Sequence, residues 1–208
     1  MPPTTPARCF WVVDGPPLYH DYHDREWGFP VADDRRLFEK LSLEAFQSGL
    51  SWLTILKKRE GFREAFAGFD VARVARFGAR DVARLLADAG IVRHRGKIEA
   101  TIANARALES LLDVESSFAA YVWRFAPPAA TQPRTITEAW LRAASTSPEA
   151  TALSKDLKRR GFRFVGPTTV QAFLQAAGLV NHHESRCHVR AAAEAARRAF
   201  VVPTSGAK

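Results

Sequence analysis

The segment RRGFRFVGPTTVQAFLQAAG, residues 159–178, contains the pattern that decides the fold. Two glycines, Gly161 and Gly166, enclose a four-residue turn, and Pro167 begins a helix after it, as proline at a first helical position favours. A second helix is expected before the turn, over residues 148–161, because a serine followed by a proline precedes it and a glycine ends it. The segment therefore predicts two helices joined by a short turn.

The predicted turn has the chemistry to hold a phosphate. The helix that starts at Pro167 directs free backbone N–H groups outward, which suits an anion. Arg159, Arg160 and Arg163 surround this position. Helix–hairpin–helix units hold a DNA backbone in this way without reading its sequence. A plain helical hairpin with a solvated basic face is the alternative, and the pattern alone favours it.

The rest of the chain also predicts helices, so the fold class is all-α. Further helices are expected at residues 34–48, 81–90, 95–112 and 181–200. Asn181 with Glu184 three residues later resembles a capping box that starts the last of them. Alternating strand patterns are close to absent. We expect a single domain over residues 8–200, in two helical lobes, with flexible tails at 1–7 and 201–208.

Composition limits the possible classes of protein. Of the 208 residues, 47% are hydrophobic, which is enough to fold. No run of 18 apolar residues is present, so no transmembrane helix is expected. The first residues do not resemble a signal peptide, so we expect a cytoplasmic protein. In the cytoplasm its two cysteines are expected to form no disulfide. We also expect a monomer.

The charge favours a polyanionic partner. The formal net charge is +8, and basic side chains at phosphates release condensed counterions. Solubility is an equal alternative on charge alone. Clustering favours nucleic acid, because basic residues gather in three places: Lys57, Lys58 and Arg59; Arg93, His94, Arg95 and Lys97; Lys158, Arg159, Arg160 and Arg163.

Cysteine and histidine positions suggest a metal site. The only cysteines are Cys9 and Cys187, and histidines lie near both of them in sequence: His20, His23, His182, His183 and His188. On a helix, the four-residue spacing of His183 and Cys187 would place both on one face. Two cysteines and two histidines can complete a tetrahedral structural zinc site. Two unconnected buried thiols are the alternative, which spacing alone favours.

Glu44 is an acid at a position where an apolar residue is expected. Leu37 and Leu41 form the apolar stripe of the helix at 34–48, and Glu44 falls on the same stripe, whereas Glu39 is expected at the surface. A buried carboxylate needs donors or a cation. An arginine or a backbone N–H is the usual partner of such a carboxylate. The more specific alternative is a bound cationic base that also contacts aromatic rings. Aromatic residues nearby are Tyr22, Trp27, Phe46 and Trp52.

Six blocks of sequence resemble the bacterial 3-methyladenine DNA glycosylase I family. They are YHDREWG (22–28), LEAFQSGLSW (43–52), ILKKRE (55–60), AGIVRHRGKIEA (89–100), KRRGFRFVG (158–166) and GLVNHH (178–183). The resemblance extends over residues 8–187. It implies a helix–hairpin–helix glycosylase that releases 3-methyladenine from alkylated double-stranded DNA and leaves an abasic site.

The resemblance also implies roles for individual residues. The zinc ligands fall on Cys9, His23, His183 and Cys187. The catalytic pair falls on Glu44 and Tyr22, and Trp52 and Trp27 bind the base. DNA contacts fall on Gly49 and Leu50, which fill the gap of the flipped nucleotide, and on Gly161, Arg163 and Gly166. The chain departs from the family's usual residues at His182, where Asp is usual, and at Gln171, where Tyr is frequent.

The sequence also points to a mechanism. Many helix–hairpin–helix glycosylases use an Asp about twenty residues after the hairpin, but no Asp follows Asp156 here, and Glu184 is expected to cap a helix instead. A 3-methyladenine base already carries positive charge and leaves without strong acid catalysis, so flipping, holding and positioning water suffice. No lysine in these blocks suits a Schiff base, so no lyase step is expected. A silent damage-binding module and a zinc-stabilised DNA adaptor are alternatives that release no free base.

Overall fold

The computed structural model describes residues 6–204, and all regular secondary structure within them is helical. The helices are η1 (Phe10–Val12), α1 (Pro17–Arg25), α2 (Asp34–Gln47), α3 (Trp52–Lys57), α4 (Arg59–Ala65), η2 (Ala67–Phe69), α5 (Val71–Ala75), α6 (Ala79–Ala87), α7 (Arg95–Leu112), α8 (Phe118–Trp123), η3 (Ala129–Thr131), α9 (Glu138–Ala143), α10 (Pro148–Arg159), α11 (Pro167–Ala176) and α12 (Arg190–Ala199). The all-α prediction is confirmed for the described residues.

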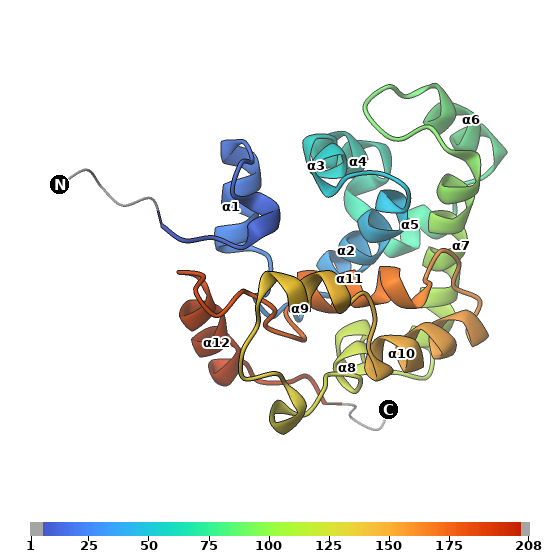
Figure 1. The fold of residues 1–208 in the computed structure, drawn as a ribbon. Coiled ribbons are helices and arrows are strands. Elements are labelled where there is room, and N and C mark those ends of the chain that lie inside the picture. Colours follow the sequence, from blue (N-terminus) through green and yellow to red (C-terminus); the bar gives the residue numbers. More distant parts are fainter. Residues whose placement is uncertain (1–5, 205–208) are drawn as a thin grey trace.

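Helices α2 and α11 pack against each other at the centre of the molecule. In Figure 1, α1 and α12 lie on one side of this pair, and α5, α6 and α7 lie on the other. The main hydrophobic core lies between α2, α7 and the segments around them. The N-terminal segment meets the loop that precedes α12, because the backbone N–H of His188 donates to the carbonyl of Ala7.

Helix α2 is held in place at its start and buried along most of its length. Asp33 caps it by accepting from the backbone N–H of Arg36 at 2.8 Å. Its buried residues include Glu39, so the prediction that Glu39 is a surface acid is wrong. Arg63 of α4 covers this face and donates to the Glu39 carboxylate at 2.8 Å. The acid is buried because it has a cationic partner from another helix.

The prediction of one helix over residues 181–200 is also wrong, because α12 begins only at Arg190. The Asn181 side chain accepts from the backbone N–H of His183 and donates to the carbonyl of Arg190, so it folds the chain locally instead of starting a helix. Glu184 does not start a helix in its own segment: its carboxylate accepts from the backbone N–H of Phe10, the first residue of η1, at 2.6 Å, so it caps that short helix instead. Residues 181–189 therefore form a loop that contacts the N-terminal segment.

Helices α10 and α11 agree with their predicted positions and are joined by turn 160–166. Ser147 caps α10, and Gly166 is the N-cap residue of α11. Gly161 has a φ of 92°, a left-handed conformation that favours glycine. No helix within residues 6–204 is both long and apolar enough to cross a bilayer. The predicted tail boundaries stay a prediction, and residues 1–5 and 205–208 lie outside the described residues.

Candidate functional site

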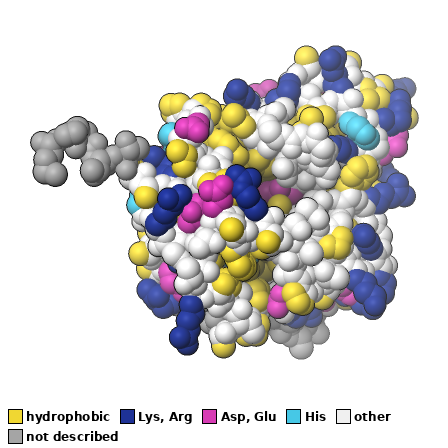
Figure 2. Space-filling model, viewed as in Figure 1, with side chains coloured by type: hydrophobic (Ala, Val, Ile, Leu, Met, Phe, Trp, Pro, Cys, Tyr) yellow, Lys and Arg dark blue, Asp and Glu magenta, His cyan; other side chains and the backbone are white. Residues whose placement is uncertain are grey.

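A pocket opens between α1, α2, α3 and α11, and it appears in Figure 2 as a hollow on the viewed face. Its volume is about 180 Å³, and its lining is mostly aromatic. The lining residues are Trp11, Tyr19, Tyr22, Trp27, Glu44, Gln47, Trp52, Ala172 and Gln175. Cavities of about 150 Å³ in other proteins accept a benzene ring. The pocket therefore has room for a small aromatic molecule.

All four residues that the sequence assigned to a base pocket line this one cavity: Tyr22, Trp27, Glu44 and Trp52. Sequence reasoning missed the other lining residues. Tyr19 and Gln47 could have been found, because each lies one helical turn from an assigned residue. Gln175 belongs to α11, and nothing in its local sequence connects it to α1 or α2.

The Glu44 carboxyl is buried in the pocket wall, with 5% of the residue exposed. Burial raises the pKa of Glu44 to about 8, and the charge of Lys40, one helical turn earlier, opposes this rise. Lys40 is buried as well, and burial lowers its pKa to about 8. The carboxyl is thus poised to ionise when a further cation enters.

Aromatic rings contact one another around this carboxyl. The ring centroids of Tyr22 and Trp52 are 5.2 Å apart, and those of Trp11 and Trp27 are 5.1 Å apart. Burial, reinforced by Glu44, raises the pKa of Tyr22 well above its usual value, so its hydroxyl keeps its proton. The indole N–H of Trp52 is buried without a hydrogen-bond partner among the described residues. The pocket therefore offers π faces and donors beside one carboxyl.

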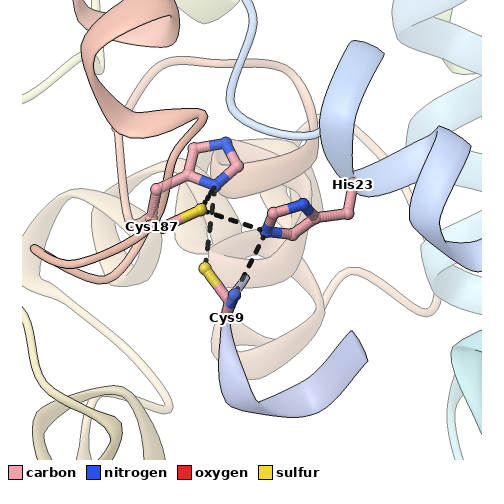
Figure 3. Close-up of side chains that lie close together, drawn as sticks. Cys9, His23 and Cys187 are labelled. Carbon is pink, nitrogen blue, oxygen red and sulfur yellow. Dashed lines mark hydrogen bonds between the residues drawn. The ribbon is translucent and has the colours of Figure 1, made fainter. Parts of the chain in front are cut away.

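Four buried side chains converge beside the pocket: Cys9, His23, His183 and Cys187. Figure 3 shows Cys9, His23 and Cys187 pointing toward one another. The Cys187 sulfur lies 3.6 Å from Nε2 of His23 and 3.5 Å from Nδ1 of His183, and the Cys9 sulfur lies 3.6 Å from the same Nδ1. Tetrahedral bonds of about 2.3 Å to sulfur and about 2.1 Å to nitrogen separate such ligands by about 3.6 Å. The cluster can hold a metal ion.

Hydrogen bonds orient both imidazoles toward the sulfurs. Nδ1 of His23 donates to the Asp24 carboxylate at 2.7 Å, which leaves Nε2 as the acceptor in the cluster. Nε2 of His183 donates to the carbonyl of Trp27 at 2.9 Å, which leaves Nδ1 free to coordinate. The Trp27 contact also connects the cluster to the pocket, because Trp27 lines the pocket and its carbonyl accepts from His183 of the cluster.

The predicted DNA-contacting residues lie at the surface. Loop 48–51 carries Gly49, with a φ of 81°, and Leu50, a large apolar side chain that is 40% exposed. Arg163 and Gly161 are exposed on turn 160–166. An added Cβ at Gly166 would meet no atom within 4 Å.

The basic clusters of the sequence have mixed positions. Basic side chains gather along the edge of Figure 2 that carries α6, α7 and α10. Several of the predicted polyanion contacts have partners within the protein instead. Arg59 pairs with Glu26, Arg95 pairs with Glu99, and Arg159 and Arg160 pair with Asp156. Lys58 and Lys97 donate to backbone carbonyls, and Lys97 is buried. Lys97 belongs to one of the basic clusters that favour a nucleic-acid partner, but it is buried, so it does not present its charge at the surface.

Comparison with known proteins identifies the family. The family model described as methyladenine glycosylase matches residues 11–191. The chain is 50% identical over 183 residues to DNA-3-methyladenine glycosylase 1 of Escherichia coli (strain K12), which covers 86% of this chain and 95% of that protein. It is 44% identical over 182 residues to DNA-3-methyladenine glycosylase of Haemophilus influenzae, covering 87% of this chain and 96% of that protein.

Solved structures agree with these relatives. A crystal structure of 3-methyladenine DNA glycosylase I has a TM-score of 0.79 and 48% identity, covering 88% of this chain and 98% of the other. A structure of the Staphylococcus aureus enzyme, solved for its recognition of 3-methyladenine, has a TM-score of 0.78 and 40% identity, covering 84% of this chain and 92% of the other. The sequence match and the shared fold extend over most of both chains. The chain belongs to the methyladenine glycosylase family.

Proposed function

We propose that this protein is a DNA-3-methyladenine glycosylase of base-excision repair, which hydrolyses the N-glycosidic bond of 3-methyladenine in alkylated DNA. The observation that carries the proposal is the buried Glu44 carboxyl in a pocket walled by aromatic rings. The curated relatives bear this activity in their names, and a solved relative was studied for recognition of the same base. A cationic aromatic base fits this combination of charge and π surface.

In the mechanism, binding of the cationic base stabilises the ionised form of Glu44. Tyr22, Trp27 and Trp52 supply the faces on which the flipped ring stacks. When the bond from C1′ to the base breaks, its electron pair neutralises the positive ring. Water adds to C1′ and loses a proton, so the products are free 3-methyladenine and an abasic site. None of the described residues lining the pocket is a lysine, so hydrolysis occurs without strand cleavage.

Two surface segments complete the proposed DNA interface. Turn 160–166, with α10 and α11, acts as a helix–hairpin–helix that holds the phosphate backbone through N–H groups beside Gly161 and Gly166, with Arg163 adding charge. Gly49 and Leu50 of loop 48–51 fill the space that the flipped nucleotide leaves, which an exposed apolar side chain suits. Double-stranded DNA is the partner.

A structural zinc ion is the proposed occupant of the metal cluster. Cys9, His23, His183 and Cys187 would hold it, and two thiolates with two imidazoles are a common donor set for zinc. When bound, the ion would cross-link the N-terminal segment to loop 181–189. Its four protein ligands leave no position for a reacting water, so the role is structural.

Release of free base tests the function directly. The purified protein should liberate 3-methyladenine from DNA treated with a methylating agent, and the product should be identified by chromatography. Alkali-labile sites should appear in equal number, and no strand breaks should form before alkali. A protein that binds methylated DNA but releases no base would be a damage-binding module instead.

A further inference from the structure

Helix α7 contacts both proposed DNA-binding segments from its interior face. Lys97 and Asn104 lie two helical turns apart on this face, and they are 6% and 1% exposed. Seven helical residues span about 10 Å along the axis. Neither side chain faces solvent, so neither can make the direct phosphate contact that the sequence suggests for Lys97.

Lys97 binds the end of α2. Its ammonium group donates to the carbonyl of Phe46 at 2.9 Å and to the carbonyl of Ser48 at 2.5 Å. The last carbonyls of a helix lack intrahelical partners and form the negative end of the helix dipole. Lys97 therefore caps α2 from another helix. Loop 48–51 begins at these carbonyls, and Leu50 lies two residues further on.

Asn104 binds turn 160–166 through both atoms of its amide. The amide nitrogen donates to the carbonyl of Arg163 at 3.0 Å, and the amide oxygen accepts from the backbone N–H of Arg163 at 2.7 Å. The N-cap residue of α7 reaches the same segment, because the rings of His94 and Phe164 are 6.2 Å apart. These contacts hold the backbone of the turn, whereas the Arg163 side chain stays exposed.

We propose that Lys97 and Asn104 are positioning residues, which hold loop 48–51 and turn 160–166 at a fixed separation along α7. Turn 160–166 binds the DNA backbone at a fixed position, and α7 holds Leu50 at a fixed distance from that position. The side chain then enters the duplex at the nucleotide that reaches the pocket. This inference rests on the proposed function, because it assigns both residues a part in nucleotide flipping.

Lys97→Met tests the proposal, because methionine keeps most of the unbranched side chain and removes its donors. Loop 48–51 should lose its register while the pocket and the exposed basic surface stay intact. Misplacement by about 1 Å can cost about 100-fold in rate, so single-turnover excision should fall roughly 10- to 100-fold. Fluorescence of 2-aminopurine beside the lesion should show less flipping. Affinity for undamaged duplex, its salt dependence and the affinity for free 3-methyladenine should match the parent.

Arg95→Met is the matched control, because Arg95 is an exposed cation in the first turn of the same helix, and its surface ion pair with Glu99 contributes little. It should reduce the salt dependence of duplex binding and leave flipping intact. If Lys97→Met behaves like Arg95→Met, Lys97 is a phosphate contact and the proposal fails. It fails equally if Lys97→Met excises at the parental rate.

A rescue variant and a second readout distinguish a positioning role from a general loss of structure. Lys97→Arg retains donors and charge, so it should recover part of the lost rate. Hydrogen–deuterium exchange should rise in residues 48–51 for Lys97→Met and in residues 160–166 for Asn104→Leu. Unchanged exchange in both segments would overturn the proposal. If the parent protein releases no 3-methyladenine, the proposed function fails, and exchange in loop 48–51 still decides the role of Lys97.

Discussion

At the scale of single residues, the cost of burying Glu44 connects stability to function. The carboxyl loses hydration in the pocket, and the nearby Lys40 compensates only part of that loss. A protein that needed the position only for stability would gain from an apolar residue there. Under the proposed function, the cost is offset when a cationic base enters, and neutral bases lack that gain. Selectivity for charged bases follows from the same burial.

Replacing Glu44 with Gln should therefore separate base recognition from the fold. The variant keeps the shape of the side chain and removes its charge, so the excision rate and the affinity for the protonated, cationic form of free 3-methyladenine should both fall. Binding to undamaged duplex should not change. Calorimetry and base release measure these effects. Glu39→Gln is the control, because Glu39 is a buried acid of the same helix paired with Arg63 outside the pocket. Parental affinity in Glu44→Gln would show that the acid is structural.

The raised pKa of Glu44 also predicts a pH dependence of stability. Its pKa changes from 4.5 to about 8 on folding, so the folded protein retains a proton that the unfolded chain loses between these values. The stability contribution of this group is present below pH 4.5 and is lost as pH rises to about 8. Urea unfolding should show that Glu44→Gln gains stability over the parent between about pH 5 and about pH 8. An equal difference at both pH values would contradict this.

Trp52 should contribute stacking energy that does not depend on charge. Its ring contacts Tyr22 and lines the pocket. Trp52→Ala should weaken binding of the free base by roughly 1–3 kcal/mol, the usual worth of stacking one base on an aromatic ring. Calorimetry at two pH values tests this, and the loss should be the same at both. A loss that vanishes at low pH would assign the effect to the neighbouring Glu44 instead.

At the scale of elements, backbone geometry at the start of α11 bears on the proposed contact with the DNA backbone. Gly166 has a φ of −63° and a ψ of 162°, which other residues can adopt, and no atom lies within 4 Å of its missing Cβ. The position therefore does not need glycine for folding. The open space adjoins the start of α11, where the first N–H groups of a helix have no intrahelical partner. Under the proposed function, glycine here leaves that space to a phosphate.

Gly166→Val should accordingly fold normally and bind every duplex less tightly. The added branches would keep a phosphate away from the helix terminus, so damaged and undamaged DNA should lose affinity by the same factor. Fluorescence anisotropy with both duplexes measures this, and circular dichroism checks the fold. Gly166→Ala, with a smaller side chain, should lose less. A loss confined to damaged DNA would contradict a backbone-holding role for the turn.

At the scale of the whole molecule, the cysteine–histidine cluster connects the two ends of the folded chain. Cys9 and His23 come from the N-terminal segment and α1, and His183 and Cys187 come from loop 181–189. Trp27 lies between the cluster and the pocket. A bound metal ion would hold the aromatic wall against the helices that carry the rest of the pocket.

Cys187→Ser should remove the metal and loosen this connection. The parent should contain about one zinc per chain by elemental analysis, and the variant much less. Its melting temperature should fall, and proteolysis should begin near residue 9. His188→Ala is the control, because His188 lies beside the cluster without belonging to it; its zinc content should match the parent. Metal-free parent protein with unchanged stability would defeat the zinc proposal.

The sequence by itself determined what depends on neighbours along the chain. Helices 34–48 and 95–112 follow from capping residues and apolar stripes, so their positions were predicted within a residue or two. The burial of Glu44 follows from its place on such a stripe. Residues 181–189 were mistaken for a helix, because the hydrogen bonds that hold the loop go to Phe10 and Arg190 as well as to near neighbours.

Only the tertiary structure decided the partners of Glu39 and Lys97 and the place of Gln175. The sequence suggests a surface acid at Glu39, but the fold buries it against Arg63. It suggests a phosphate contact at Lys97, but the fold buries this side chain against the end of α2. Gln175 joins the pocket from α11, more than a hundred residues from Glu44. Local sequence sets backbone preferences within a few residues. The partner of a buried charge is set by packing between distant segments, because desolvation makes an unpartnered charge too costly.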